Sequence, residues 1–503
     1  MTHGSLRRAW ILTPCALLFS AIASAGRAQT TQPSTQPEFG LSPTTALAEP
    51  STAKTPDEVF EELVRKSKNP VPWFKWGADL RLRDEYLHDV VTLDTKSLNN
   101  DEHYQRYRAR WWASILPMKD VELFVRLGWE GRSYCLPVNP ANPNNPEKPL
   151  DRGWMWQRDQ VMFDNLYLKL SNVGGLPLTI IGGRQDIMLG DGWWTGEGGP
   201  LDGARTFYFD AVRATYEFKD AKTTVDLMWL QLDAQGDAWL PKVYEDPIPP
   251  LMLEDDQNGV ILYVTNRSLP KTEISPYFVY KHSGHEEFLD KRTGYDADLY
   301  MFGTRVAGDI TDHWKYRTDI AGQFGWRDAT GSNHQRICAL GSNNRLSYFV
   351  NDQWKQEYFV DLEYLSGDDP GTKGVYEGFD ILWGRYPRWT ELYGFTYVRE
   401  SRMFDFTNLW RIGPGWKGKP LKNLELGFHY DFLFAPENPM DGVNPMFADG
   451  CFRGQLLVPY AKYTFNDHMF FRAMPEVFLP GDYYAKSNND TAVFWRFEIN
   501  LTW

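Results

Sequence analysis

The sequence predicts an all-β fold: a transmembrane antiparallel β-barrel of about 18 strands, with about 16 as the alternative, preceded by a short N-terminal helix. Three observations carry this prediction. The N-terminus has the composition of an export signal, apolar and polar residues alternate from Trp73 onward, and the chain closes on an alternating strand that ends in Trp503. A period of two gives each strand one apolar and one polar face, as a barrel wall between lipid and water requires.

Residues 1–28 are predicted to be a secretory signal peptide. Arg7 and Arg8 precede an apolar run from Ala9 to Ala23, and small residues follow at Ala23-Ser24-Ala25. A basic region, a short apolar region and a small-residue stop are the three parts of such a signal. Pro14 interrupts the run, which is also too short to cross a membrane as a helix. We therefore expect an exported protein.

Two short regions are expected between the signal and the barrel. Residues 29–56 are rich in Pro, Ser, Thr and Gln, which predicts a disordered linker. Residues 57–70 are predicted to contain a short amphipathic helix, because apolar residues recur there at helical spacing. These are Val59, Phe60, Leu63 and Val64. The helix either plugs the periplasmic mouth of the barrel or rests on its rim, and the sequence leaves both open.

Residues 71–503 are assigned to the barrel. The first alternating segments are 76–86, 104–116 and 121–131, and tight turns alternate with long Gly-, Pro- and Asn-rich connections, as in outer-membrane barrels. The pattern recurs at 160–172, 176–187, 206–218, 223–232, 258–266, 272–282, 297–308, 314–326, 335–349, 354–365, 389–399, 404–413, 422–433, 453–465, 468–479 and 491–503.

Composition narrows the class further. Aromatic residues make up 15% of the chain, with 21 Trp and 26 Tyr, and barrels concentrate these residues in interfacial girdles. The formal charge of -13 argues against a nucleic-acid partner. The cysteines (Cys15, Cys135, Cys338 and Cys451) have no short spacing, so neither a disulfide framework nor a metal site is expected, and nothing predicts a cofactor.

The last strand supplies a sharp local signal. Phe497, Ile499, Leu501 and Trp503 share one face, and the chain ends on the last of them. A final strand of this kind resembles the recognition signal of the outer-membrane barrel assembly machinery. The alternative is the last strand of an ordinary soluble sheet. We therefore expect the bacterial outer membrane as the location, with its lipid and its assembly machinery as partners.

The stretch 183–218 (GRQDIMLGDGWWTGEGGPLDGARTFYFDAVRATYEF) resembles the alginate-export family of outer-membrane porins. Segments 361–369, 408–432 and 476–484 also resemble parts of that family. The resemblance implies a monomeric barrel that passes an anionic polysaccharide through an arginine-lined pore, with periplasmic secretion components as possible partners. The linker and helix before the barrel depart from the family, and the acidity of the chain is unusual for a polyanion channel.

Arginines are the candidate pore-lining residues. The polar phase of the first three barrel segments carries Arg81, Arg83, Arg106, Arg108, Arg110 and Arg126. Guanidinium groups bind carboxylates in a bidentate way and stay charged at any relevant pH. We expect a band of arginines on one lumen wall. It either binds a uronate polymer or braces the barrel through ion pairs with neighbouring carboxylates, and the two roles are weighted equally.

The family-like stretch adds a second set. Arg184 and Arg213 are further candidates for the pore lining, and Asp186, Arg205 and Asp210 are expected to hold a constriction together. Structural ion pairing is the simpler explanation for Arg205 and Asp210, which lie at a strand entrance.

An enzyme is not expected. Asp361 and Glu363 share a strand face, but carboxylates two residues apart are ordinary on the polar face of a strand. Two other functions stay open besides the polysaccharide channel. One is a general or uptake porin for small acidic solutes. The other, from a different class, is a secreted all-β glycan-binding protein or glycoside hydrolase.

Overall fold

The computed structural model describes residues 56–97, 101–136, 156–196, 209–233, 243, 256–284, 296–329, 333–384, 389–401 and 405–503. The predicted signal peptide and nearly all of the predicted linker lie outside these residues, as does Arg205. Within the described ranges, no helix is long and apolar enough to cross a membrane. Residues 60–503 form one compact unit.

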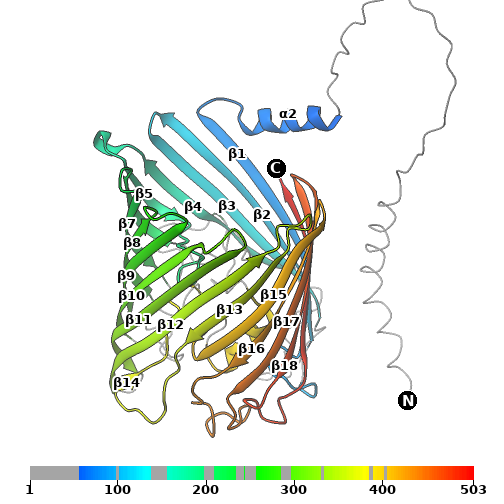
Figure 1. Ribbon diagram of the computed structural model, residues 1–503. Helices are drawn as coiled ribbons and strands as arrows, with labels where there is room; N and C mark the ends of the chain where they lie inside the picture. Colours follow the sequence, from blue (N-terminus) through cyan, green and yellow to red (C-terminus); the bar gives the residue numbers. More distant parts are fainter. Residues whose placement is uncertain are drawn as a thin grey trace, which may run out of the picture. The chain divides into compact units, whose positions relative to one another are not determined.

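Eighteen long strands close into an antiparallel barrel, which confirms the predicted fold class (Figure 1). Closure comes from ten residue pairs between β1 (Phe74–His88) and β19 (Ala492–Thr502), which join the first and last strands. The remaining barrel strands are β2 (Asp101–Met118), β3 (Val121–Leu136), β4 (Trp156–Leu170), β5 (Leu178–Gln185), β6 (Phe209–Phe218), β7 (Thr223–Leu232), β8 (Asp256–Asn266), β9 (Thr272–Gly284), β10 (Ala297–Asp309), β11 (Trp314–Ala329), β12 (Asn333–Phe349), β13 (Glu357–Leu365), β15 (Leu409–Leu421), β16 (Leu424–Phe434), β17 (Phe452–Asn466) and β18 (Met469–Pro480).

The short strand β14 (Val375–Tyr376) is not part of the barrel circuit. It pairs in parallel with β12, whereas β13 pairs directly with β15. The predicted helix is α2 (Pro56–Lys68), which begins one residue before the expected region and ends two residues before its end. A 3-10 turn, η1 (Val173–Gly175), connects β4 to β5.

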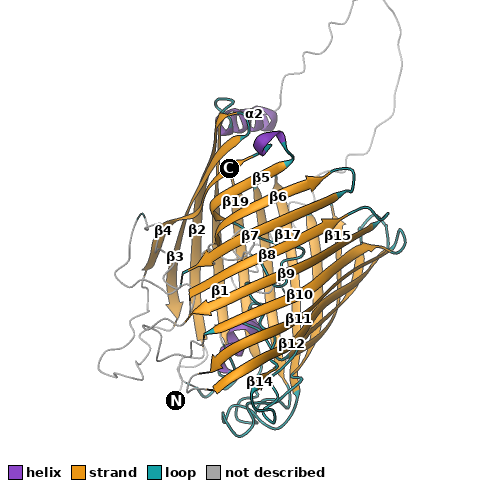
Figure 2. Ribbon diagram, turned by 90° about the vertical axis from the view of Figure 1, so that its left-hand side faces the viewer, coloured by secondary structure: helices purple, strands orange, loops and turns teal. Residues whose placement is uncertain are grey.

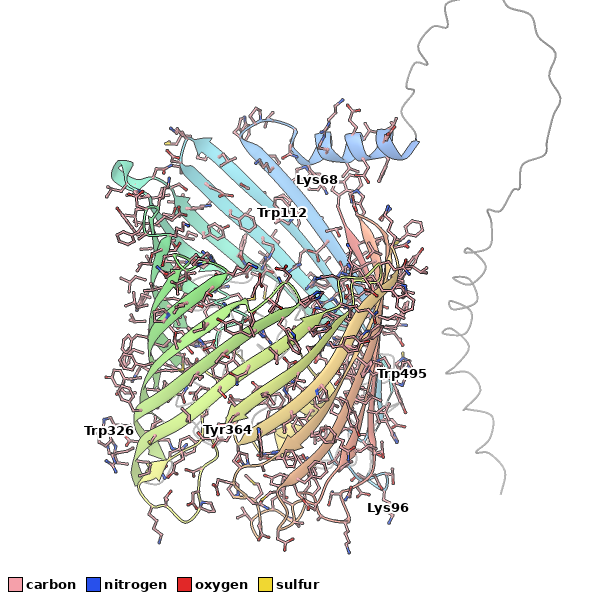
Figure 3. The ribbon with its side chains drawn as sticks, viewed as in Figure 1. Lys68, Lys96, Trp112, Trp326, Tyr364 and Trp495 are labelled. Atoms are coloured by element: carbon pink, nitrogen blue, oxygen red, sulfur yellow. The ribbon has the colours of Figure 1, made fainter. Side chains whose placement is uncertain are left out.

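The two faces of the wall have the predicted characters. On β1 the buried side chains of Arg81, Arg83 and Glu85 alternate with the more exposed Leu80 and Leu82. Large exposed apolar side chains recur on the other strands, and Figure 3 shows Trp326 and Trp495 on the outer surface. Hydrocarbon offers no partner to polar groups, so an apolar outer face and a charged inner face identify the lipid and water sides of the wall.

The two ends of the barrel differ. Tight turns such as Met118–Val121 lie at the end that also holds α2 and the C-terminus, whereas the long connections lie at the other end (Figure 1). In bacterial barrels, short turns face the periplasm and long loops face the exterior. We therefore call these the periplasmic and outer ends.

Long connections from the outer end fold back inside the barrel. We call residues 186–196, 377–384 and 389–401 the lumenal segments. The first two meet where the Trp383 backbone N–H donates to the Trp194 carbonyl oxygen at 2.9 Å, and both indoles are almost fully buried. A Cβ atom on Gly384 would lie 1.8 Å from the Trp193 carbonyl oxygen, so only glycine permits this contact.

The expected strand at 389–399 is wrong. The chain there forms α3 (Leu392–Thr396) and the 3-10 turn η3 (Tyr397–Arg399), and Figure 2 shows a helical segment enclosed by the strands. The helix starts because the Tyr393 N–H donates to the Thr390 hydroxyl and the Leu392 N–H donates to the Glu476 carboxylate. Alternating aromatic residues imitate a strand in the sequence, but Tyr393 and Tyr397 are fully buried within the lumen.

Candidate functional site

The predicted arginine wall is assembled by the register of β19, β1 and β2. Arg81 lies opposite Arg108, and Arg83 lies opposite Arg106, so like charges face each other across one strand pair. On the other edge of β1, Arg83 lies opposite Glu498. Directly opposed like charges destabilise a sheet unless carboxylates lie between them. The arginine wall (Arg81, Arg83, Arg106, Arg108, Arg110 and Arg126) is interleaved with such carboxylates.

Carboxylates from neighbouring strands bind the centre of the arginine wall. The Arg83 Nε atom lies 2.6 Å from Glu498, and the Arg106 Nε atom lies 2.8 Å from Glu130. The Arg496 guanidinium adds a 2.7 Å contact to Glu85. These side chains are almost fully buried, apart from Arg106 at 14% exposure. The wall is therefore a tightly packed ion-pair lattice at this level.

The edges of the arginine wall are also paired. Arg108 and Arg110 share the Asp79 carboxylate at 3.1 and 2.8 Å. Arg126 contacts the β4 carboxylate of Asp164 at 2.7 Å and donates two hydrogen bonds to Asp186. Ion pairs of this kind are what the bracing role, one of the two weighed from the sequence, requires.

The second predicted set is dispersed along neighbouring strands. Arg184 makes a bidentate ion pair with Asp210, at 2.8 and 2.9 Å. Asp186 follows β5 and binds the arginine wall through Arg126. Arg213 pairs with Asp226 at 2.8 Å and keeps a quarter of its side chain exposed.

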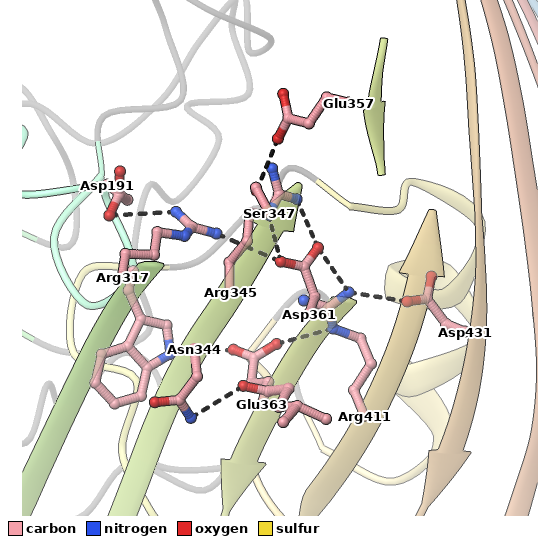
Figure 4. Close-up of polar contacts among 12 residues, drawn as sticks. Asp191, Arg317, Asn344, Arg345, Ser347, Glu357, Asp361, Glu363, Arg411 and Asp431 are labelled. Atoms are coloured by element: carbon pink, nitrogen blue, oxygen red, sulfur yellow. Dashed lines mark hydrogen bonds and ion pairs between the residues drawn. The ribbon is translucent and has the colours of Figure 1, made fainter. Parts of the chain in front are cut away.

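A second charged cluster, which the sequence did not indicate as a site, lies on β11 to β16 (Figure 4). Asp361 accepts two 2.6 Å hydrogen bonds from Arg345 and lies 3.7 Å from Arg317 and 3.8 Å from Arg411. Arg411 in turn contacts Asp431 at 2.9 Å. We call this group the Asp361 network (Arg317, Arg345, Asp361, Glu363, Arg411 and Asp431). Arg317 and Arg345 keep 25% and 28% of their side chains exposed. The paired arginines of the arginine wall are all less exposed.

The lumenal segments attach to the wall through carboxylates. Asp191 contacts Arg305 at 2.8 Å and Arg317 at 3.2 Å. Burial raises the pKa of Asp191, but these two guanidinium groups outweigh burial and hold its pKa below the usual value. Other carboxylates of the lumenal segments also form ion pairs with cations of the barrel strands: Asp186 with Arg126, Asp380 with Lys281, Glu391 with Arg496 and Glu400 with Arg453.

The carboxylates that resembled a glycosidase pair belong to the Asp361 network. Glu363 contacts Arg411 at 3.3 Å and accepts a 3.0 Å hydrogen bond from the Trp193 indole, so both Asp361 and Glu363 are held by cations or donors. In the described part of the chain, no group of His, Cys, Asp and Glu side chains is arranged to hold a metal ion.

A closed 18-strand wall, apolar outside and charged inside, defines a bacterial outer-membrane channel. The alginate-export family model matches residues 73–432, and the chain belongs to this family. No curated protein matches the sequence.

Solved porin structures share the fold. One is OccAB2 of Acinetobacter baumannii, with 10% identity and a TM-score of 0.51 over 85% of this chain and 98% of that chain. Another is OpdK of Pseudomonas aeruginosa with vanillate, with 10% identity and a TM-score of 0.51 over 85% of this chain and 99% of that chain. At such low identity these similarities support the barrel fold alone.

Proposed function

We propose that this channel passes an anionic polysaccharide or oligosaccharide whose uronate carboxylates bind lumen guanidinium groups in turn. The arginine wall, Arg184 and Arg213 would line its path, together with Arg305, Arg317 and Arg345, which the sequence did not single out. The family assignment supports the polymer, and the charge arrangement supports the mode of binding.

The attachment of the lumenal segments carries this proposal. Their carboxylates (Asp186, Asp191, Glu391) contact arginines of the barrel strands from inside the lumen, at 2.5 to 3.2 Å, and only one of these arginines, Arg126, belongs to the arginine wall. A uronate carboxylate has the same charge and the same bidentate geometry. Arginines that bind a carboxylate of the protein's own loop can also bind a sugar carboxylate. Because these arginines share carboxylate partners, each site binds the sugar weakly enough to release it.

Passage of a polymer then requires the lumenal segments to move aside. The Trp194 ring packs against Tyr277 of β9, and the Trp383 indole donates a hydrogen bond to Gln257 of β8. The first two segments therefore occupy the lumen beside these strands. A polyanion has the means to displace them, because it competes for the same cations. Competition at Arg305 and Arg317 is the first step that we expect.

The second candidate is a porin for small acidic solutes. The filled lumen favours it, because a monosaccharide acid needs less displacement than a polymer. The neighbour OpdK was solved with vanillate, a small molecule, although its fold likeness alone transfers no substrate. Both candidates use the same arginines and differ in the length of ligand that binds.

A length series of mannuronate oligomers separates the two candidates. Single-channel conductance of the refolded mature protein in a planar bilayer would be recorded with mannuronate, short oligomers and polymannuronate. For the polymer channel we expect block that strengthens steeply with chain length, with neutral dextran of equal size as the inactive control. Equal block by monomer and polymer favours the small-solute porin. A channel indifferent to every uronate contradicts both.

Assembly and partners follow the same proposal. We expect the barrel assembly machinery to read the outward face of β19 (Phe497, Ile499, Leu501) with Trp503, and we expect the barrel to act as a monomer. Periplasmic secretion components would deliver the polymer if the direction of flow is export.

A further inference from the structure

Helix α2 leaves much of its apolar face uncovered. Val64 is buried, but Phe60 and Leu63 remain 48% and 61% exposed. An amphipathic helix of a globular protein normally buries such a face against its core. The exposure of two large apolar side chains on one short helix therefore indicates an apolar neighbour that is not part of the described chain.

The contacts of α2 place it on the lipid side of the rim. The Phe60 ring packs edge-on against His468 and Trp503, with ring centroids 6.0 and 6.2 Å apart. The Trp76 indole donates a 2.6 Å hydrogen bond to the Ser67 carbonyl oxygen. Trp76 belongs to the outward phase of β1, and Trp503 continues the outward phase of β19. The described contacts of the helix therefore involve the rim and its outer face.

The surroundings of the helix match a membrane interface. Trp73, more than half exposed, and Trp503 extend the aromatic, lipid-facing surface of the barrel to the periplasmic end. Such residues settle at the level of the lipid headgroups. The last turn of α2 carries Arg65, Lys66 and Lys68, whose long side chains can reach phosphate groups.

We propose that α2 is an interfacial anchor, bound to phospholipid in the inner leaflet of the outer membrane. Phe60 and Leu63 enter the boundary between headgroups and acyl chains, and the basic last turn faces the phosphates. Helices with one apolar face and cationic residues lie in this plane. This role is independent of what the channel transports.

Spin labels at single cysteines test this anchor. The full mature chain, with Cys135, Cys338 and Cys451 replaced by serine, would be refolded into vesicles of three parts phosphatidylethanolamine to one part phosphatidylglycerol. Leu63→Cys reports on the apolar face and Lys66→Cys on the charged face. Leu80→Cys on the lipid-facing wall and Val443→Cys in an exposed outer loop serve as lipid and water references.

Collision with oxygen and with a water-soluble nickel chelate then gives the depth of each label. We expect the oxygen-to-nickel ratio at Leu63 to approach that at Leu80 and to exceed that at Val443 about tenfold, as for a residue below the headgroups. The ratio at Lys66 should stay near the Val443 value. A Leu63 label as accessible to nickel as Val443 overturns the proposal, as does one shielded from both reagents, which would mean that protein covers the helix. Heat-modifiable migration on gels confirms that each labelled variant is folded.

Discussion

The arginine wall and the Asp361 network place similar residues in different surroundings. In the first, Arg83 and Arg108 are almost fully buried, and their partners are carboxylates of the same strands and their neighbours. In the second, Arg317 and Arg345 keep about a quarter of their surface exposed, and Asp191 of a lumenal segment contacts Arg317. Removal of one partner from a buried ion pair is strongly destabilising, so such charges stay paired, whereas partly exposed charges with a detachable partner are available to a ligand. From this comparison we propose that the arginine wall mainly braces the barrel and that the Asp361 network mainly exchanges ligands.

The largest expected effect is a loss of stability when Arg496, which lies beside the arginine wall, is replaced. Arg496→Ala removes the 2.7 Å partner of Glu85, and both side chains are 1% exposed. Loss of Arg496 removes the closest cation from the buried Glu85, and the remaining Arg83 and Arg106 lie farther away, at 3.7 and 4.0 Å. We therefore expect the free energy of unfolding to fall by about 3 kcal/mol. Urea unfolding in lipid vesicles, followed by tryptophan fluorescence, measures this.

Arg345→Ala is the matched variant in the Asp361 network. We expect a loss of about 1 kcal/mol, because the side chain is partly exposed and Asp361 stays near Arg317 and Arg411. Equal losses of stability for Arg496→Ala and Arg345→Ala would remove the distinction between the arginine wall and the Asp361 network.

Asp191→Asn is expected to have an intermediate effect on function. It removes the negative charge that Arg305 and Arg317 hold while it keeps the shape of the side chain. We expect anion selectivity to rise and half-block by polymannuronate to need about threefold less polymer, roughly 0.7 kcal/mol. Asp312→Asn, at an exposed periplasmic turn, is the control. Unchanged block in Asp191→Asn would mean that Asp191 does not compete with the ligand.

The smallest effect concerns pH. The pKa of Asp191 lies below its ordinary value of 3.8, so the contribution of its ion pairs is fully present above the ordinary value and is lost only as pH falls through the lowered pKa. Conductance should therefore stay constant between about pH 7 and about pH 5 if this carboxylate holds the segment in place. A midpoint within that range, abolished in Asp191→Asn, would show that Asp191 titrates at a raised pKa instead.

Local sequence pattern was sufficient for the arginine wall and insufficient for the Asp361 network. Arg106, Arg108 and Arg110 alternate within one strand, so their shared face follows from the period of two. Arg317, Arg345 and Arg411 stand one to a strand and meet only through the register of β11, β12, β13 and β15. The approach of Asp191 depends on the path of a long connection, which periodicity does not encode.

The wrong strand at 389–399 has a related cause. Alternating Tyr393, Phe395 and Tyr397 resemble a lipid-facing row, but their surroundings are the filled lumen. A buried segment can be apolar on both faces, and the caps from Thr390 and Glu476 then select a helix. Long connections are where barrel sequences carry the least information about their own fold, because tertiary contacts decide it.

Uronate binding by lumen arginines is tested most directly by one conductance experiment that compares the arginine wall with the Asp361 network. Half-block by polymannuronate would be measured for Arg317→Ala with Arg345→Ala and for Arg106→Ala with Arg108→Ala, each checked for folding by heat-modifiable migration. We predict that the first pair needs about tenfold more polymer than the unmodified channel, equivalent to about 1.4 kcal/mol, and that the second needs about threefold more. Block that is unchanged in both pairs would contradict binding of uronates by lumen arginines.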